Sequence, residues 1–160
     1  MSSKREIGSK FLKRIFPLIL APSVSSKTIK DNIQFIKEDE SRSSSLLYDK
    51  NHQIRFFKYE NQYLPTIQFI RENPSIDLPL VKVDQGAVPH ILNGANIYNQ
   101  GITFVDRVFR ANTIIMIANP QNAILALGKA LITSSELIDS KGKGIINIHY
   151  LGDKLWENKL

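Results

Sequence analysis

Seven of the eight glycines of this chain lie between residues 86 and 152. Short apolar segments rich in β-branched residues run between these glycines, at residues 95–98, 113–118 and 123–132. Glycine adopts the backbone conformations that strands need where they turn sharp corners. This alternation is typical of a small, tightly wound β-barrel, so we predict one in the second half of the chain.

The sequence of the first half of the chain predicts a mixture of helix and strand. Residues 46–48 and 54–59 flank a turn-like segment at residues 49–51, which indicates a β-hairpin. A short helix is expected to begin at residues 64–66, with Pro65 in its first turn, and to end at Asn73. The fold class is therefore α+β, with an N-terminal α+β domain at residues 1–80 and a second domain at residues 81–160.

Further helices are predicted near both ends of the chain. Ile7, Phe11 and Ile15 recur at four-residue spacing, which indicates an amphipathic helix with basic residues off its apolar stripe. Residues 133–136 read Thr-Ser-Ser-Glu, a capping box that predicts a second short helix. A turn at Asp153 is expected to lead into a final strand near Trp156.

The net charge of +6 suits an anionic partner such as RNA, or a well-solvated surface. Residues 1–80 carry 13 basic and 9 acidic side chains, and residues 81–160 carry 8 and 6, so the second domain has a net charge of only +2. The longest apolar stretch near the N-terminus is interrupted by Pro17 and is too short to span a membrane. We expect a cytoplasmic protein.

Catalytic and metal-binding motifs are missing from the sequence. The chain has no cysteine, and its three histidines, His52, His90 and His149, have no spacing typical of metal ligands. No nucleophile elbow and no phosphate-binding loop is present. We expect no metal, no cofactor and no catalytic activity.

The most informative segment runs from Val83 to Ile97. It predicts a tight turn at Gly86, a short helix over residues 87–92, a second turn at Gly94 and then a strand. Small side chains at such turns let a phosphate or ribose approach the backbone amides closely, although glycine turns in small barrels are also commonly structural. Tyr98, just after this segment, is a candidate for stacking on a base.

This segment resembles the start of a PUA domain. The matching residues are Val83-Asp84, Gly86-Ala87, residues 94–97 and Gly101. In the closing stretch, residues 143–145, 147–151 and 155–156 and Asp153 match the same family. The resemblance is narrower still to the malignant T-cell-amplified sequence proteins and their yeast translation-machinery-associated relative. It implies a PUA-type β pseudo-barrel after a family-specific N-terminal domain.

The resemblance also implies a function. Such proteins are non-catalytic RNA-binding factors of translation initiation, recycling and reinitiation. They act at the small ribosomal subunit, near the acceptor end of a tRNA and against ribosomal RNA, with an SUI1-domain partner similar to density-regulated protein. Carried over by position, the RNA-binding residues are Gly86, Ala87, Val88, His90, Gly94, Ala95 and Asn96, with Lys129 as a flank.

Two alternatives follow from the same residues. PUA domains are also attached to RNA-modifying enzymes, but the first 80 residues are too few for a catalytic domain of that kind. The stronger alternative is a protein-interaction scaffold whose PUA domain does not bind RNA, because phosphate contacts normally supply much of the affinity and the second domain is only weakly basic. Gly94→Asp is expected to weaken RNA binding without unfolding the barrel.

Overall fold

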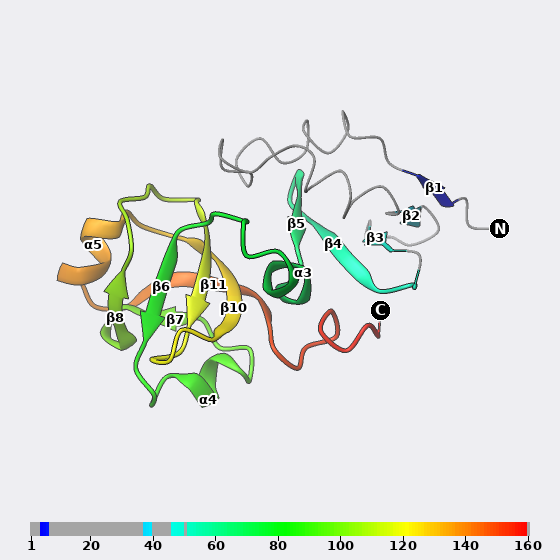
Figure 1. Ribbon diagram of the computed structural model, residues 1–160. Helices are drawn as coiled ribbons and strands as arrows, with labels where there is room; N and C mark the ends of the chain where they lie inside the picture. The colour runs from blue at the N-terminus through cyan, green and yellow to red at the C-terminus, as the bar shows by residue number, and fades with distance from the viewer. Residues whose placement is uncertain (1–3, 7–36, 40–45, 50, 160) are drawn as a thin grey trace. The chain divides into compact units, whose positions relative to one another are not determined.

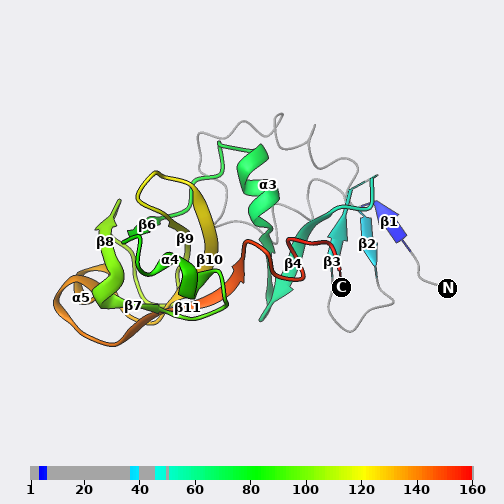
Figure 2. The same cartoon turned by 90° about the horizontal axis from the view of Figure 1, so that it is seen from below.

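The computed structural model describes residues 4–6, 37–39, 46–49 and 51–159. The chain divides into two compact units, residues 1–77 and residues 78–160. Each unit has a sheet of its own; Figure 1 labels most of their strands and helices, and Figure 2 also labels β9.

The first unit contains a five-stranded antiparallel sheet. Its strands follow one another in chain order, β1-β2-β3-β4-β5, so each strand pairs with its neighbour in sequence. The predicted hairpin is confirmed, because Leu47 of β3 pairs with Phe56 of β4. The strands are β1 (Lys4–Glu6), β2 (Lys37–Asp39), β3 (Leu46–Tyr48), β4 (Ile54–Tyr59) and β5 (Gln62–Pro65).

A carboxylate organises the turn of the hairpin. Asp49 Oδ1 accepts hydrogen bonds from the backbone N–H groups of Asn51 (2.8 Å) and Gln53 (3.0 Å), while its Oδ2 accepts from Arg55 Nε (2.8 Å). Burial, the largest single influence, opposes ionisation, but these hydrogen bonds and the Arg55 charge together lower the pKa of Asp49. An ionised Asp49 therefore fixes the turn that joins β3 to β4.

The N-terminal prediction is partly wrong. Lys4 and Arg5, which the sequence placed among the basic residues off the apolar stripe of the helix or at its edges, belong to strand β1. The rest of the expected amphipathic helix lies outside the described residues.

The start of the helix in this unit also differs from the prediction. Pro65 is the last residue of β5, and the helix α3 (Ile67–Glu72) begins only after Thr66. Thr66 is the N-cap, because its Oγ1 accepts a hydrogen bond from Phe69 N at 3.3 Å. Proline is tolerated in β5 because that strand lies at the edge of the sheet. The helix packs on the hairpin through the rings of Phe56 and Phe69, whose centroids are 4.6 Å apart.

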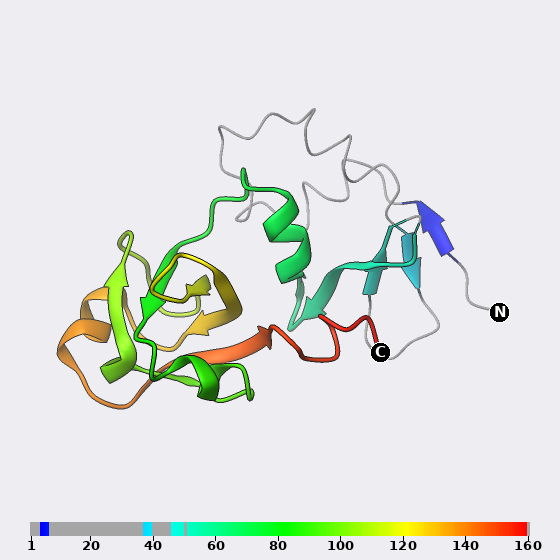
Figure 3. The ribbon, with the colours of Figure 1, turned by 60° about the horizontal axis from the view of Figure 1, so that its bottom comes forward.

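The second unit is a six-stranded mixed sheet that curls into a half-barrel (Figures 1 and 3). The strand order is β7-β11-β10-β9-β6-β8, and all pairs are antiparallel except β6 with β9. Helix α5 lies on the β8 side of the sheet in Figures 1 and 2. The elements are β6 (Leu80–Val83), α4 (Val88–Ile91), β7 (Ile97–Tyr98), the 3-10 helix η1 (Asn99–Gly101), β8 (Ile102–Val105), β9 (Ile114–Ala118), β10 (Ile124–Ala130), α5 (Ser134–Asp139) and β11 (Lys143–Tyr150).

The inside of the half-barrel is apolar. Val81, Ile115, Ile117, Ala126 and Ile145 are fully buried there, together with side chains from α4 and α5. The predicted barrel of the second half and its α+β class are therefore confirmed.

Two details near the end of the chain differ from the prediction. Helix α5 forms where the capping box predicted it, but its N-cap Thr133 makes no side-chain hydrogen bond to a backbone N–H; its Oγ1 donates to Glu136 Oε1 at 3.1 Å instead. After β11 the described chain continues in turns, so the predicted final strand is wrong. The turn at Asp153 does form, with Asp153 N donating to Tyr150 O at 3.2 Å.

The described residues include no helix of the length and apolar character that crossing a membrane requires. Nor do they bring three or more histidine, aspartate or glutamate side chains together as a metal site would.

Candidate RNA-binding site

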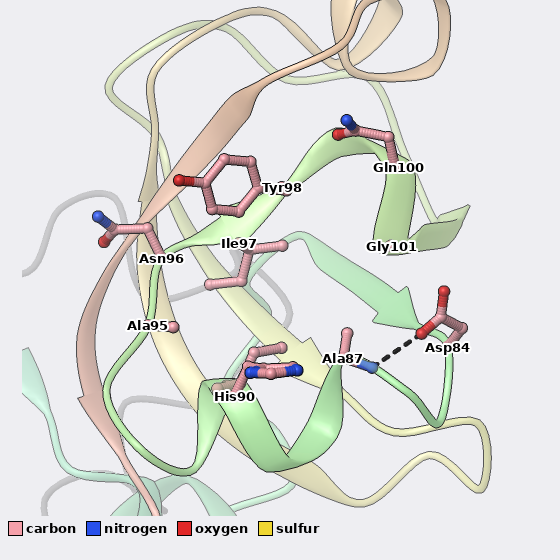
Figure 4. Close-up of a pocket in the computed structure, with 10 residues that line it drawn as sticks. Asp84, Ala87, His90, Ala95, Asn96, Ile97, Tyr98, Gln100 and Gly101 are labelled. Carbon is pink, nitrogen blue, oxygen red and sulfur yellow. Dashed lines mark hydrogen bonds between the residues drawn. The ribbon is translucent and has the colours of Figure 1, made fainter.

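A hollow of about 440 Å³ opens on the second unit between α4 and the segment formed by β7 and η1 (Figure 4). Small, aromatic and amide side chains form most of its wall. It is lined by Asp84, Ala87, His90, Ile91, Ala95, Asn96, Ile97, Tyr98, Gln100 and Gly101.

One side of the hollow is held by the turn between β6 and α4. Asp84 N donates to Gly101 O at 2.8 Å, which ties this turn to η1. Asp84 Oδ1 accepts from Ala87 N at 2.8 Å, the dashed line in Figure 4, and so leads the chain into α4. A Cβ at Gly101 would lie 3.3 Å from the Cβ of Ala87, so the two segments approach closely at this point.

The turn after α4 depends on the backbone freedom of Gly94. Its φ of +90° is a conformation that other residues rarely adopt, and an added Cβ would lie 3.2 Å from Tyr150 Oη. Any side chain at Gly94 would therefore strain the turn. The expectation that Gly94→Asp leaves the fold intact is not supported, because that variant would change stability and binding together.

Strand β11 fixes the segment that follows this turn. Asn147 Nδ2 donates to Ile91 O at 3.1 Å and to Ala95 O at 3.0 Å, and Asn147 N donates to Asn96 Oδ1 at 2.9 Å. One residue of β11 thus holds both the end of α4 and the start of the next strand. The wall of the hollow is preorganised by the sheet.

The predicted contact residues occupy three different environments. Ala87, His90, Ala95 and Asn96 line the hollow, as a binding role requires. Val88 is only 8% exposed and belongs to the apolar core.

The other three predicted residues do not line the hollow. Gly86 is exposed in the turn between β6 and α4, and Gly94 lies in the turn after α4. Lys129 is half-buried in β10, between β9 and β11.

Gln100 lines the hollow but was missed in the sequence, and Tyr98 was noted there only for stacking. Tyr98 is 55% exposed, which is high for an aromatic side chain in a folded unit. The alternation of Asn96 and Tyr98 is the signal that could have found part of this wall, because alternate residues of an extended chain share a face. Gln100 lies in the 3-10 helix η1, so strand alternation could not have found it.

The charge of the lining differs from that of the whole chain. Asp84 is the only acidic side chain among the ten lining residues, and no lysine or arginine is among them. Counterion release by lining cations therefore cannot be the main source of affinity for a nucleic acid in this hollow. Stacking and hydrogen bonds have to supply more of it.

A buried histidine–carboxylate pair holds the end of β11. The fully buried His149 contacts Asp153 Oδ2 through its Nδ1 at 2.7 Å, and Asp153 also accepts from Tyr150 N (2.9 Å) and Trp156 N (2.8 Å). Burial opposes ionisation of Asp153, yet the His149 contact and the two backbone N–H groups lower its pKa overall. The pair does not line the hollow and serves the structure of the turn after β11.

Comparison with known proteins identifies the family. Residues 79–151 match the model of the PUA domain, which covers almost the whole second unit. Translation machinery-associated protein 20 of Saccharomyces cerevisiae is 33% identical over 137 residues, covering 79% of this chain and 72% of the yeast protein. The chain belongs to the translation machinery-associated protein 20 and malignant T-cell-amplified sequence family. The resemblance in the motifs is thereby confirmed.

Other members of this family match along nearly the whole chain. Translation machinery-associated protein 20 of Eremothecium gossypii is 29% identical, over 99% of this chain and 90% of that protein. The malignant T-cell-amplified sequence 1 homologue of Dictyostelium discoideum is also 29% identical, over 97% and 91%. The N-terminal unit is therefore shared with the family as well as the PUA domain.

Solved structures support the same fold. A conserved PUA domain protein from Thermoplasma acidophilum is 27% identical with a TM-score of 0.71, over 97% of this chain and 98% of that one. A protein from Pyrococcus horikoshii has a TM-score of 0.75 at 23% identity, which shows the likeness of fold alone.

Proposed function

We propose that this chain is a non-catalytic RNA-binding protein that works in translation. The observation that carries the proposal is the hollow of the PUA domain, where the exposed ring of Tyr98 stands among amide side chains. Exposed aromatic rings beside hydrogen-bonding groups are how many proteins hold unstacked bases. Relatives named for their association with the translation machinery support the setting.

The finer proposal is action on the small ribosomal subunit in the cytoplasm, close to the acceptor end of a tRNA. An SUI1-domain protein similar to density-regulated protein would act with it, in recycling and reinitiation. The family membership supports both points. Binding to a folded ribosomal surface also offers a source of affinity that a hollow without lysine or arginine needs.

A binding role suits the chemistry of the hollow better than catalysis does. Asp84 is its only carboxylate, and Asp84 Oδ1 is engaged with Ala87 N. General acid–base catalysis commonly needs two titratable groups with pKa values set apart. The other titratable side chains of the lining are His90 and Tyr98, and within the described residues no hydrogen bond joins Asp84 to either of them.

The test is co-sedimentation with purified small ribosomal subunits over a series of salt concentrations, with and without the SUI1-domain partner. We expect binding that weakens as salt rises and strengthens when the partner is present. Tyr98→Leu should lower the affinity about tenfold, since a stacked base contributes about 1–3 kcal/mol. Phe104→Leu is the matched control, because Phe104 is 48% exposed on β8 and does not line the hollow.

No binding to the subunits, with the SUI1-domain partner still bound, would overturn the RNA-binding proposal. That result would favour the interaction scaffold instead. Equal losses in Tyr98→Leu and Phe104→Leu would show that the hollow is not the contact surface.

A further inference from the structure

Three alternate residues form one wall of the hollow. Asn96, Tyr98 and Gln100 all line it, and Figure 4 shows them in succession, from the residue before β7, through β7 and into η1. Asn96 and Tyr98 are alternate residues of an extended segment and share a face, whereas Gln100 comes from the 3-10 helix η1. In Figure 4 the ring of Tyr98 stands between the two amides.

Both amides have their oxygen engaged by the protein itself. Asn96 Oδ1 accepts from Asn147 N at 2.9 Å, and Gln100 Oε1 accepts from Gly142 N at 3.3 Å. Within the part of the chain that the structure describes, neither amide nitrogen donates a hydrogen bond. Each side chain therefore presents an NH2 group, which is a donor only.

The orientation of these amides is fixed by the backbone. If either amide turned over, its NH2 group would face a backbone N–H, and two donors would oppose each other. Asn147 is itself held by its hydrogen bonds to Ile91 O and Ala95 O, so the donor that orients Asn96 cannot easily move away. The row presents donor, ring, donor in a fixed order.

We infer that this row binds one unpaired nucleotide of single-stranded RNA, with its base stacked on Tyr98 and its two flanking phosphates at Asn96 and Gln100. The inference rests on the proposed function and specifies its ligand. The two phosphates of a nucleotide lie on either side of its base along the strand, as the two amides lie on either side of the ring. Asparagine and glutamine amides are common donors to phosphate oxygens, and a neutral donor row suits a lining that lacks lysine and arginine.

Duplex RNA does not fit this row. In a duplex both faces of each base are covered by stacking on neighbouring base pairs, so no base face is available to Tyr98. The row therefore discriminates between single-stranded and duplex RNA. It discriminates little between bases, because every base has a π-face that can stack on an aromatic ring.

The experiment uses the full chain with fluorescein-labelled oligouridylate, either single-stranded or annealed to oligoadenylate, and measures fluorescence anisotropy. Asn96→Asp and Gln100→Glu keep the oxygen that accepts from the backbone and replace the donor NH2 with an acceptor. Asn93→Asp is the matched control, because it makes the same charge change in the exposed turn after α4 without lining the hollow. Thermal unfolding of each variant checks that the fold is retained.

We expect the single strand to bind at least about tenfold more tightly than the duplex, the difference that one stacked base contributes. Asn96→Asp and Gln100→Glu should each weaken single-strand binding about tenfold, as loss of a hydrogen bond to a charged group does. Asn93→Asp should weaken it only about twofold, and that loss should disappear in high salt because it is purely electrostatic. The losses at the row should remain in high salt.

Three results would overturn the inference while leaving RNA binding in place. These are equal affinity for duplex and single strand, equal losses in Asn93→Asp and the row variants, or row losses that vanish in high salt. If the unmodified chain binds neither these probes nor the ribosomal subunit, the proposed function fails and this inference fails with it.

Discussion

The glycines of the PUA domain fall into two groups that differ in what surrounds them. Gly128 and Gly144 are buried in the middle of the sheet, in β10 and β11. A Cβ at Gly128 would lie 2.5 Å from Ile145 Cγ2 and 2.8 Å from Ile146 O, and a Cβ at Gly144 would overlap Asn99 and Leu137. These two positions need glycine because no space exists for a side chain.

The glycines around the hollow have more space. A Cβ at Gly86 would meet only Asp84 Oδ1, at an ordinary contact distance of 3.4 Å. Gly94 has a positive φ, so the backbone conformation is what requires a glycine at this position. The sequence does not distinguish these glycines. In the structure, packing requires glycine at positions 128 and 144, backbone conformation requires it at position 94, and neither requires it at position 86. Variants at these positions should therefore differ in stability.

The largest effect is expected at Gly128. Gly128→Val forces a branched side chain against Ile145 and the backbone oxygen of Ile146, so the strands have to move apart. Overpacking of this kind costs about 1–3 kcal/mol and sometimes more. Urea unfolding should show a free energy of unfolding lower by at least about 2 kcal/mol, and an unchanged value would mean that β10 and β11 are not packed as described.

Gly94→Ala is expected to have the next largest effect. An alanine held at a positive φ costs about 1–2 kcal/mol, and the added Cβ also presses on the Tyr150 ring. Gly94→Asn is the matched variant, because asparagine tolerates this region better and should cost less. If both variants cost the same in urea unfolding, crowding by Tyr150 and not the backbone conformation sets the requirement.

The strands, the hairpin and the short helices that depend on local sequence signals were predicted well. The apolar runs at residues 113–118 and 123–132 became β9 and β10 with shifts of only a residue or two at their ends. The hairpin and both short helices of the PUA domain were predicted because turn residues and periodicity are local signals. Pro65 was placed wrongly because its fixed φ suits a helix start and an edge strand equally well.

The hollow was predicted less completely, because contacts between distant residues build it. Asn96 is oriented by Asn147, which is 51 positions away in the chain. Val88 sits beside exposed residues in the sequence but points into the core, since one face of a short helix has to pack. The direction of a single amide depends on such tertiary contacts, so the donor row could not be read from residue types alone.

A smaller loss of stability is expected at Asp153, because a charge and not packing holds the turn after β11. Asp153→Asn leaves one acceptor oxygen where Asp153 has two, so either Tyr150 N, which bonds Oδ2, or Trp156 N, which bonds Oδ1, loses its acceptor, and the charge beside His149 is removed. Loss of a hydrogen bond of this kind costs about 1 kcal/mol. The pKa of Asp153 is lowered in the folded state, so its contribution is complete above its ordinary value of 3.8 and is lost as the pH falls through the lower, folded value.

Urea unfolding from neutral pH downward measures this contribution. The difference in stability between the unmodified chain and Asp153→Asn should be constant near neutral pH and should shrink below about pH 4. Asp139→Asn is the control, because Asp139 is an exposed carboxylate at the end of α5. A difference that stays constant into acid would show that packing, as at Gly128, and not charge holds the end of β11.

The smallest effect on stability is expected at Gly86. Gly86→Ala meets no close neighbour and needs no unusual backbone conformation, so its effect should lie within about 0.5 kcal/mol, as for other surface substitutions. RNA affinity is the informative readout, because the family resemblance places Gly86 on the binding surface although it does not line the hollow. We expect anisotropy to show affinity for single-stranded oligouridylate lower by about twofold, because the methyl group obstructs the approach of the strand to the turn. Unchanged affinity would confine the contact surface to the hollow and its row of Asn96, Tyr98 and Gln100.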